Sequence, residues 1–342
     1  MGGVISANAD NVLHLVSNLN NWNTNDSENT YLFSYTNDGT QEIYEYTITS
    51  SMLSNAAVED LYFRINFWDN WGQLRPATNE NNGNGAFTFS ENGQWQTWET
   101  WSKGDSNGAF EIAHSSIKAA AYKITVYRKQ QGDKPGAWVK AEIISMPAKV
   151  SSLGYSTFSC DRALDLDNAT GITVYKASVN TDNKVVLTKV TGKVAAGTGL
   201  LLAGEANATG TIPVVTTDLG ESVSGNLLKA TVTAQTVTAS TEGAYRYFLA
   251  GTSSEDIGFY YLAADATSGA GKAYLETTTA LANESGSDSR AAWIFQNSET
   301  TGIKDATRSL TTMESTYDLL GRPVKGNKAG LYIKNGKKVI VK

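Results

Sequence analysis

Residues 122–127 read Tyr-Lys-Ile-Thr-Val-Tyr, a stretch in which apolar or aromatic side chains alternate with polar ones. The same period of two recurs at residues 13–16, 43–48 and 61–67. Such alternation is typical of a β-strand with one face in a core and the other in water. Turn-forming residues separate these stretches at intervals of roughly ten residues, which is the rhythm of a sandwich. We therefore predict an all-β protein, with a single helical turn over residues 51–60.

A change in composition near residues 146–152 predicts a domain boundary. Tryptophan is abundant before it, whereas Thr, Val and Ala dominate after it and only Trp293 remains. We predict three parts: a Trp-rich β-sandwich over residues 10–147, a β-rich region over 150–299, and a linker with a small β block over 300–342. Strands are expected in the second part at residues 172–179, 184–190, 199–203, 245–250, 257–262, 272–276 and 292–296. In the third part, Asn335-Gly336 between two apolar runs predicts a hairpin.

Charge and cysteine content exclude several classes of protein. Charged residues make up 18% of the chain and the net charge is −6. An acidic body argues against nucleic acid as a partner, because binding phosphates requires Lys and Arg. The last part is basic, but its charges alternate with strand-forming residues, so we interpret it as a solvated strand pair. The single Cys160 excludes an intrachain disulfide and is expected to be a buried apolar residue. The sequence has no apolar run long enough for a transmembrane helix, so no membrane span is expected.

The tryptophans are the main functional clue. Seven of the eight lie in the first 140 residues, and five fall between Trp68 and Trp101 among Asn, Gly, Gln, Thr and Ser. A Trp ring offers a flat apolar face that can cover the C–H face of a sugar, while polar neighbours bind its hydroxyls. We expect a polysaccharide or oligosaccharide ligand, bound by residues of the two Trp clusters: Trp68, Trp71, Arg75, Trp95, Trp98, Trp101 and Lys103.

Strand geometry limits how many of these rings can meet one ligand. If residues 95–101 form a strand, Trp95 and Trp101 share a face about 20 Å apart and Trp98 lies on the other face. At least one of the three is then expected in the core. A sandwich of this size also needs one or two buried Trp residues, and we assign that role to Trp22 and Trp138.

The N-terminal part resembles the starch-binding modules of SusE/SusF-type outer-membrane proteins. The resemblance is carried by residues 13–23 (Leu-His-Leu-Val-Ser-Asn-Leu-Asn-Asn-Trp-Asn), by residues 62–68 running on to Arg75-Pro76, and by the closing pair 121–127 and 137–144. It implies an immunoglobulin-like β-sandwich that binds glycan through aromatic platforms without catalysis. The chain departs from the family in the run Trp95-Gln-Thr-Trp-Glu-Thr-Trp101, so a ligand other than starch is left open.

The C-terminal part resembles the sorting domains of type IX secretion substrates. Residues 316–324 (Thr-Tyr-Asp-Leu-Leu-Gly-Arg-Pro-Val) and the later Gly330-Leu-Tyr, followed by a basic hairpin, carry this resemblance. It implies export to the surface or medium of a Gram-negative bacterium, with the secretion machinery as a partner of the block. Residues 150–299 resemble the β-domain that often precedes such tails, and a spacer role is expected for them.

Motifs for chemistry are weak. Residues 165–171 begin like a calcium loop but lack the fifth-position ligand and the sixth-position Gly. With two lone His residues, the sequence offers neither a zinc site nor a triad, so we expect no cofactor, no metal and no enzyme. Asp69, Glu91 and Glu99 lie near the Trp clusters and leave a glycosidase open. The main hypothesis is non-catalytic glycan binding by an exported protein, or by the C-terminal part of a glycan-degrading enzyme. The alternative is a surface adhesin or structural protein with Trp residues at a protein interface.

Overall fold

The fold is described from a computed structural model. The described residues are 13–23, 31–67, 72–76, 86–89, 95–101, 109–131, 134–217, 219–253, 256–284, 289–296, 316–317, 330–334 and 337–341. Strands dominate these ranges, so the all-β prediction is confirmed. By its internal contacts the chain divides into two units, residues 1–296 and 297–342.

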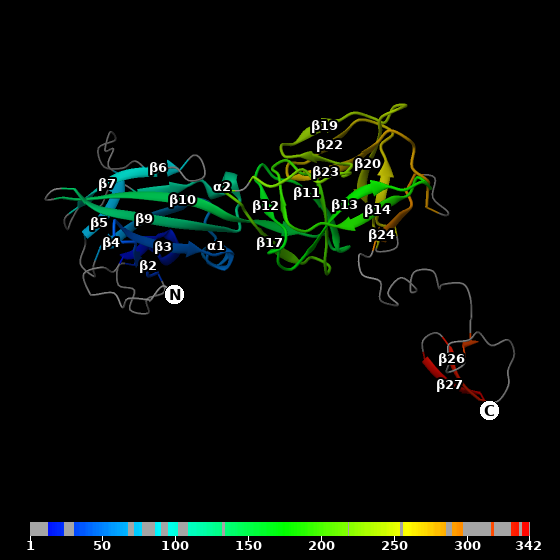
Figure 1. The fold of residues 1–342 in the computed structure, drawn as a ribbon, viewed down its shortest axis with the longest axis horizontal. Helices are drawn as coiled ribbons and strands as arrows, with labels where there is room; N and C mark the ends of the chain where they lie inside the picture. Colours follow the sequence, from blue (N-terminus) through cyan, green and yellow to red (C-terminus); the bar gives the residue numbers. More distant parts are fainter. Residues whose placement is uncertain are drawn as a thin grey trace. The chain divides into compact units, whose positions relative to one another are not determined.

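The first part of unit 1 is built on an 11-stranded sheet (Figure 1). Its order is β2-β3-β9-β10-β7-β5-β4-β8-β6, with β1 on β4 and β17 on β10. The strands are β1 (Leu13–Ser17), β2 (Ser34–Asn37), β3 (Glu42–Ile48), β4 (Leu61–Phe67), β5 (Gly72–Pro76), β6 (Ala86–Phe89), β7 (Trp95–Trp101), β8 (Ala109–Ile112), β9 (Ala121–Gln131), β10 (Lys134–Lys149) and β17 (Thr209–Pro213). Neighbours are antiparallel except β6 and β8, which are parallel.

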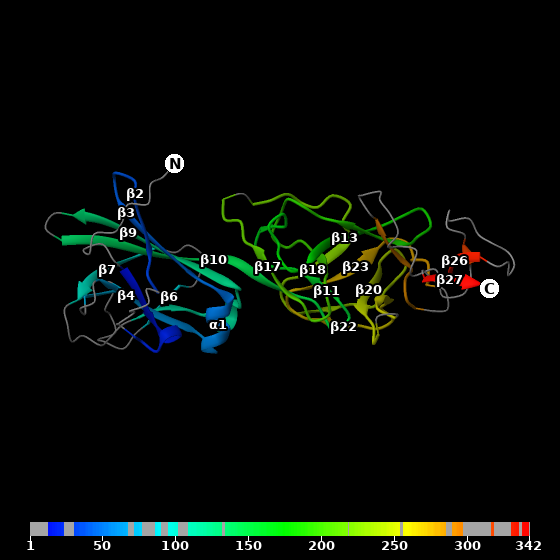
Figure 2. The same cartoon turned by 90° about the horizontal axis from the view of Figure 1, so that it is seen from below.

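The sheet folds over a core of aromatic and aliphatic side chains in the manner of a β-sandwich. Strands β3, β9 and β10 lie side by side in both views (Figure 2), and their inward residues pack with those of β4 and β8. The largest fully buried side chains there are Tyr44, Tyr122, Phe63 and Phe110. In β4 the alternation is plain: Leu61, Phe63 and Ile65 are all 0% exposed. Burial of these apolar faces stabilises the sheet, at about 25 cal/mol per Å² of apolar surface.

No Trp is among the buried core residues that the structure describes. Trp22 is 41% exposed and Trp138 is half-buried. The assignment of these two rings to the core was therefore wrong. Tyr and Phe occupy the inward positions of β3, β4, β8 and β9 and fill this core.

The predicted helical turn is confirmed but is shorter than expected. Helix α1 runs over Ser50–Ala56, and the Thr49 hydroxyl caps it by accepting from the Met52 N–H. Ala57 adopts a left-handed conformation with φ 48°, which ends the helix before Asp60. A second short helix, α2 (His114–Ile117), and a 3₁₀ turn, η2 (Asn18–Asn20), were not predicted.

Strand β10 crosses the predicted domain boundary. Its first part pairs with β7 and β9, and its last residues, Ser145 to Lys149, pair with β17. Met146 packs against both the first core and a second one around Leu200, Leu202 and Ile212. The division into residues 10–147 and 150–299 stays a prediction, since one continuous strand contributes to both cores.

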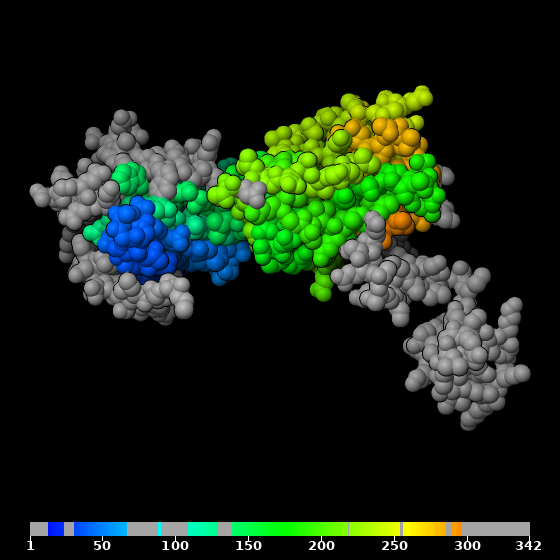
Figure 3. Space-filling view, viewed as in Figure 1, coloured from blue at the N-terminus to red at the C-terminus, as the bar shows by residue number. Residues whose placement is uncertain are grey.

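The rest of unit 1 consists of short strands in several sheets. A five-stranded sheet has the order β11-β16-β13-β14-β24, a four-stranded sheet has the order β18-β23-β20-β21, and two strand pairs are β12-β15 and β19-β22. The bounds are β11 (Tyr155–Phe158), β12 (Leu164–Asp165), β13 (Thr173–Val179), β14 (Val185–Lys189), β15 (Lys193–Val194), β16 (Leu200–Ala203), β18 (Leu228–Thr231), β19 (Gln235–Val237), β20 (Tyr245–Ala250), β21 (Gly258–Tyr261), β22 (Ala266–Ser268), β23 (Lys272–Thr277) and β24 (Trp293–Gln296). In the space-filling view these residues, green to orange, form one continuous body (Figure 3).

Unit 2 contains a three-stranded sheet. Its strands are β25 (Thr316–Tyr317), β26 (Gly330–Lys334) and β27 (Lys337–Val341). Lys334 pairs with Lys337, so β26 and β27 form the hairpin that the sequence predicts. The expected linker at residues 300–316 lies outside the described residues except for Thr316, which is the first residue of β25.

Candidate functional site

A tight turn after β1 presents Trp22. The Ser17 hydroxyl accepts from the Leu19 N–H, and the Asn20 side chain accepts from the Ser17 N–H, so η2 has a reciprocal cap at its start. Asn21 and Trp22 then take left-handed backbone conformations, with φ 53° and 60°. A left-handed Trp is strained, whereas Asn tolerates this region. The cap and the Trp22 N–H donating to the Ser17 carbonyl at 2.8 Å hold the turn in this form.

The side chain of Asn18 fixes the same turn to the beginning of β4. Its Nδ2 donates to the Asp60 carbonyl at 2.7 Å, and its Oδ1 accepts from the Tyr62 N–H at 3.1 Å. The amide therefore bridges two backbone groups that lie more than 40 positions away along the chain. This bridge places Trp22 beside the outward face of β4.

The Trp22 ring lies against a cation and keeps a large exposed surface. The Arg64 guanidinium carbon stands 5.5 Å from the ring centroid. Burial lowers the pKa of Arg64 from its ordinary value, yet a guanidinium remains charged at any physiological pH. A cation over a Trp face contributes about 0.5–1 kcal/mol at exposed sites. Arg64 thus orients the ring, and the 41% exposure leaves apolar surface for a partner.

The outward residues of β4 form a polar row beside this ring. Tyr62 Oη donates to Glu111 Oε1 at 2.9 Å, and this hydrogen bond raises the pKa of Tyr62. Thr88 donates to the other Glu111 oxygen. At the far end of the row, Asn66 is 1% exposed, and neither its Oδ1 nor its Nδ2 has a hydrogen-bond partner among the described residues. A buried amide left in this state costs about 1–3 kcal/mol.

In the register of the sheet, the face that holds the polar row on β4 continues through β5 to β7. Asn66 pairs with His14 on one side and with Gln73 of β5 on the other, and Gln73 pairs with Trp101. Paired positions lie on the same face of a sheet, about 4.8 Å apart per strand. The positions of Asn66 and Trp101 therefore share one face, two strands apart.

Residues 95–101 are a strand, so the alternation considered for the Trp run applies to its backbone. Gln96 pairs with Val139, which is 0% exposed and lies in the core, and Trp98 occupies a position of the same parity. Trp95 pairs with Lys140, whose Nζ forms a 2.7 Å ion pair with Glu142 on the outer face. The backbone thus places the positions of Trp95 and Trp101 on the outer face and that of Trp98 on the core face.

The structure covers the predicted ligand residues unequally. Trp68, Trp71 and Lys103 lie outside the described residues. Arg75 in β5 and Trp95, Trp98 and Trp101 in β7 are described by their backbone alone; Arg75 pairs with Glu99. Their roles as ligand contacts stay predictions.

Sequence reasoning missed Trp22 and Asn66. A signal for Trp22 was present in Asn20-Asn21-Trp22-Asn23, because Asn-rich turns adopt left-handed conformations and lie at the surface. Asn66 lies in a regular alternating strand, and nothing in that pattern distinguishes it from a solvated Asn.

Cys160 is a free cysteine and is buried. Burial raises the pKa of Cys160 to about 11, which keeps the thiol protonated, and its Sγ lies 3.4 Å from the Arg162 carbonyl. Within the described ranges, no group of three or more His, Cys, Asp or Glu is arranged to hold a metal ion. Likewise, none of the helices in those ranges has the length and apolar character needed to cross a bilayer.

The arrangement suits stacking and hydrogen bonding. It offers the exposed Trp22 ring and the Arg64 guanidinium beside it, whereas the Asn66 amide is covered. Comparison with known proteins found no match: no family model, no curated protein and no solved structure is similar to this chain.

Proposed function

We propose that this chain is a non-catalytic carbohydrate-binding protein, and that Trp22 is a platform of its site. The observation that carries the proposal is the exposed Trp22 ring, held by a capped turn and by Arg64. The exposed ring is a flat apolar face that a partner can cover, and burying it against a ligand would be favourable. A sugar ring placed on this face keeps its hydroxyls free to bond with polar groups at the rim.

The polar residues around the platform support a sugar over a purely apolar partner. Asn20 and Asn23 lie within two positions of Trp22 in the sequence, and Arg64 of the polar row on β4 lies beside its ring. We infer that the ligand extends along this row toward the positions of Trp101 and Trp95 on β7. Trp68 and Trp71 follow β4 in the sequence and remain candidate contacts.

The setting that we propose is the outside of a Gram-negative bacterium. The C-terminal block supports it through its similarity to type IX sorting domains and through its three-stranded sheet with a terminal hairpin. Polysaccharides are abundant in that setting, which makes a flat exposed Trp a useful contact.

Affinity electrophoresis of the full chain tests the proposal. The protein is run in native gels that contain soluble glucan, xylan or mannan, alongside the variants Trp22→Ala and Tyr261→Ala. Tyr261 is a matched control, because it is an aromatic residue of similar exposure, 40%, far from Trp22 in the sequence. We expect retardation in at least one gel, its loss in Trp22→Ala, and no change in Tyr261→Ala.

Two results would contradict this function. Absence of retardation in every gel would favour a protein partner for the Trp residues. Retardation that Trp22→Ala leaves unchanged would remove Trp22 from the site. Circular dichroism of each variant shows whether the fold is intact, and release of reducing sugar from the retained glycan would show that the protein is an enzyme.

A further inference from the structure

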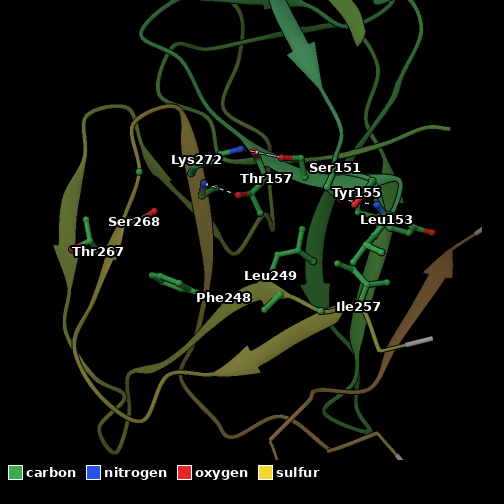
Figure 4. A pocket seen from close by; sticks show the side chains of 16 residues that line it. Ser151, Leu153, Tyr155, Thr157, Phe248, Leu249, Ile257, Thr267, Ser268 and Lys272 are labelled. Carbon is green, nitrogen blue, oxygen red and sulfur yellow. Dashed lines mark hydrogen bonds between the residues drawn. The ribbon is translucent and has the colours of Figure 1, made fainter. Parts of the chain in front are cut away.

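A cavity in the middle of the chain opens where two paired strands separate (Figure 4). Strands β20 and β23 are paired from Tyr245–Thr277 to Tyr247–Leu275, and the pairing stops there. Both strands nevertheless continue, β20 to Ala250 and β23 back to Lys272. The gap is lined by these two segments, by β11 and its preceding turn, and by residues 267–269. Its volume is about 390 Å³, within the range of small-molecule sites.

The wall of the cavity combines apolar and hydroxyl groups. Phe248, Leu249, Tyr155 and Leu153 are half-buried side chains that contribute apolar surface. Six Ser and Thr residues also line it: Ser151, Ser152, Ser156, Thr157, Thr267 and Ser268. The hydroxyls of Ser151, Thr157 and Ser268 already bond with the Leu153 N–H, the Ala273 N–H and the Thr231 hydroxyl. Lys272 is the one cation among the described lining residues, and none of those residues is acidic.

No described residue that lines this site carries a charge opposite to that of Lys272. Its Nζ donates to Ser156 Oγ at 3.1 Å. Lys272 takes part in none of the ion pairs found between described side chains. An ammonium has three donors, so two remain for a ligand. A cation beside half-buried apolar surface favours an anionic group on the ligand over a neutral one.

The two strand segments are fixed in their separated positions. On the β23 side, the Ala273 N–H donates to Thr157 Oγ1 at 3.2 Å rather than to β20. On the β20 side, the chain turns at Gly251, where φ is 153° and an added Cβ would lie 2.5 Å from Ile257 Cα. Asp256 closes this turn by accepting from the N–H groups of Thr252 and Ser253 at 2.8 and 2.6 Å. The cavity is therefore built into the fold.

We propose that this cavity binds one acidic sugar residue, a hexuronate, through its carboxylate at Lys272. The apolar face of the sugar lies on Phe248 or Leu249, and its hydroxyls bond with the Ser and Thr side chains of the wall. Size, the mixture of apolar and hydroxyl groups, and the single cation all agree with one charged ring. The inference extends the proposed carbohydrate function to a second site and makes residues 150–299 a binding region in addition to a spacer.

Titration calorimetry of the full chain tests the second site. Trigalacturonic acid is the probe, maltotriose is the uncharged sugar control, and acetate represents the carboxylate alone. The variants are Lys272→Gln and, as a matched control, Lys229→Gln, because Lys229 is an exposed lysine on β18 of the same sheet that does not line the cavity. We expect trigalacturonic acid to bind, and Lys272→Gln to weaken it by roughly tenfold or more, the loss of one charged hydrogen bond. Lys229→Gln should leave its affinity unchanged.

Trp22→Ala separates the two proposals. It should abolish retardation by neutral polysaccharide and leave trigalacturonic acid binding intact, whereas Lys272→Gln should weaken trigalacturonic acid binding and leave the retardation intact. No binding of trigalacturonic acid, or binding that Lys272→Gln does not weaken, would overturn the cavity proposal while leaving the Trp22 site untouched. Acetate binding with equal affinity, or loss of trigalacturonic acid binding in Trp22→Ala, would overturn it as well.

Discussion

The buried side chain of Asn66 lowers the stability of the fold instead of raising it. Its side chain is buried with both polar atoms unpaired, which a fold would avoid unless the amide had another role. We predict that Asn66→Leu leaves the melting temperature unchanged or raises it, since replacing an unsatisfied amide with an apolar side chain of similar size removes its desolvation cost.

Asn226 provides the matched control for Asn66. It is also an Asn beside the core, but its Oδ1 accepts from the N–H groups of Ala177 and Leu228, both at 3.2 Å, and its Nδ2 donates to the Gly199 carbonyl at 2.7 Å. Asn226→Leu should therefore destabilise the protein by about 1–3 kcal/mol. Thermal unfolding of both variants checks the pair, and equal losses of stability would refute the distinction.

His114 makes stability depend on pH. Its Nδ1 lies 2.8 Å from Tyr122 Oη. Burial lowers the pKa of His114 below its ordinary value of 6.5, although nearby Asp60 opposes this shift. The unfolded chain therefore takes up the proton at a higher pH than the folded chain does. The contribution to stability is fully present above about pH 6.5 and is lost as the pH falls below that value.

The variant His114→Gln removes this titration. We predict that the fall in unfolding free energy between about pH 7 and 5.5 is smaller in His114→Gln than in the natural protein. Urea unfolding at several pH values measures it. The prediction fails if both proteins show the same slope in this window.

At the scale of elements, β7 divides the Trp run into two groups. The positions of Trp98 and Gln96 lie on the core face, because Gln96 is paired in register with the buried Val139. The positions of Trp95 and Trp101 lie on the outer face. We predict that Trp98→Ala costs about 3–5 kcal/mol, as truncation of a large core side chain does. Trp95→Ala and Trp101→Ala should cost about 1 kcal/mol or less and should instead weaken glycan retardation. Urea unfolding and affinity electrophoresis of the three variants decide it; equal destabilisation by all three would contradict the register.

Strand existence could be predicted from the sequence because alternation reports which face is buried. Residues 61–67 and 245–250, for example, have their predicted bounds. Short strands such as β12 and β15 could not be predicted, because a strand of two residues shows no alternation. The exposure of Trp22 could not be predicted either. It depends on a side-chain cap and on Arg64, which lies 42 positions later in the sequence and contacts the ring only in the folded sheet. The cavity depends on the position at which the pairing of β20 and β23 ends, and no local sequence pattern predicts that position.

At the scale of the whole molecule, β10 couples two cores. Met146 packs against both of them, and its partner in register is Ile212, which is 0% exposed in the second core. Truncating Ile212 should therefore destabilise the region before residue 140 as well as its own core. We predict that Ile212→Ala costs about 2–5 kcal/mol and lowers the melting temperature by several degrees.

The distribution of Trp makes this coupling measurable. Seven of the eight Trp residues precede residue 140, so Trp fluorescence reports mainly on the region before residue 140, while circular dichroism reports on strands throughout the chain. If β10 couples the stability of the two cores, Ile212→Ala shifts the fluorescence and dichroism transitions together, as coincident probes do in cooperative unfolding. A dichroism transition that moves while the fluorescence transition stays in place would show two independent domains, with the boundary near residues 146–152 that the change in composition predicts.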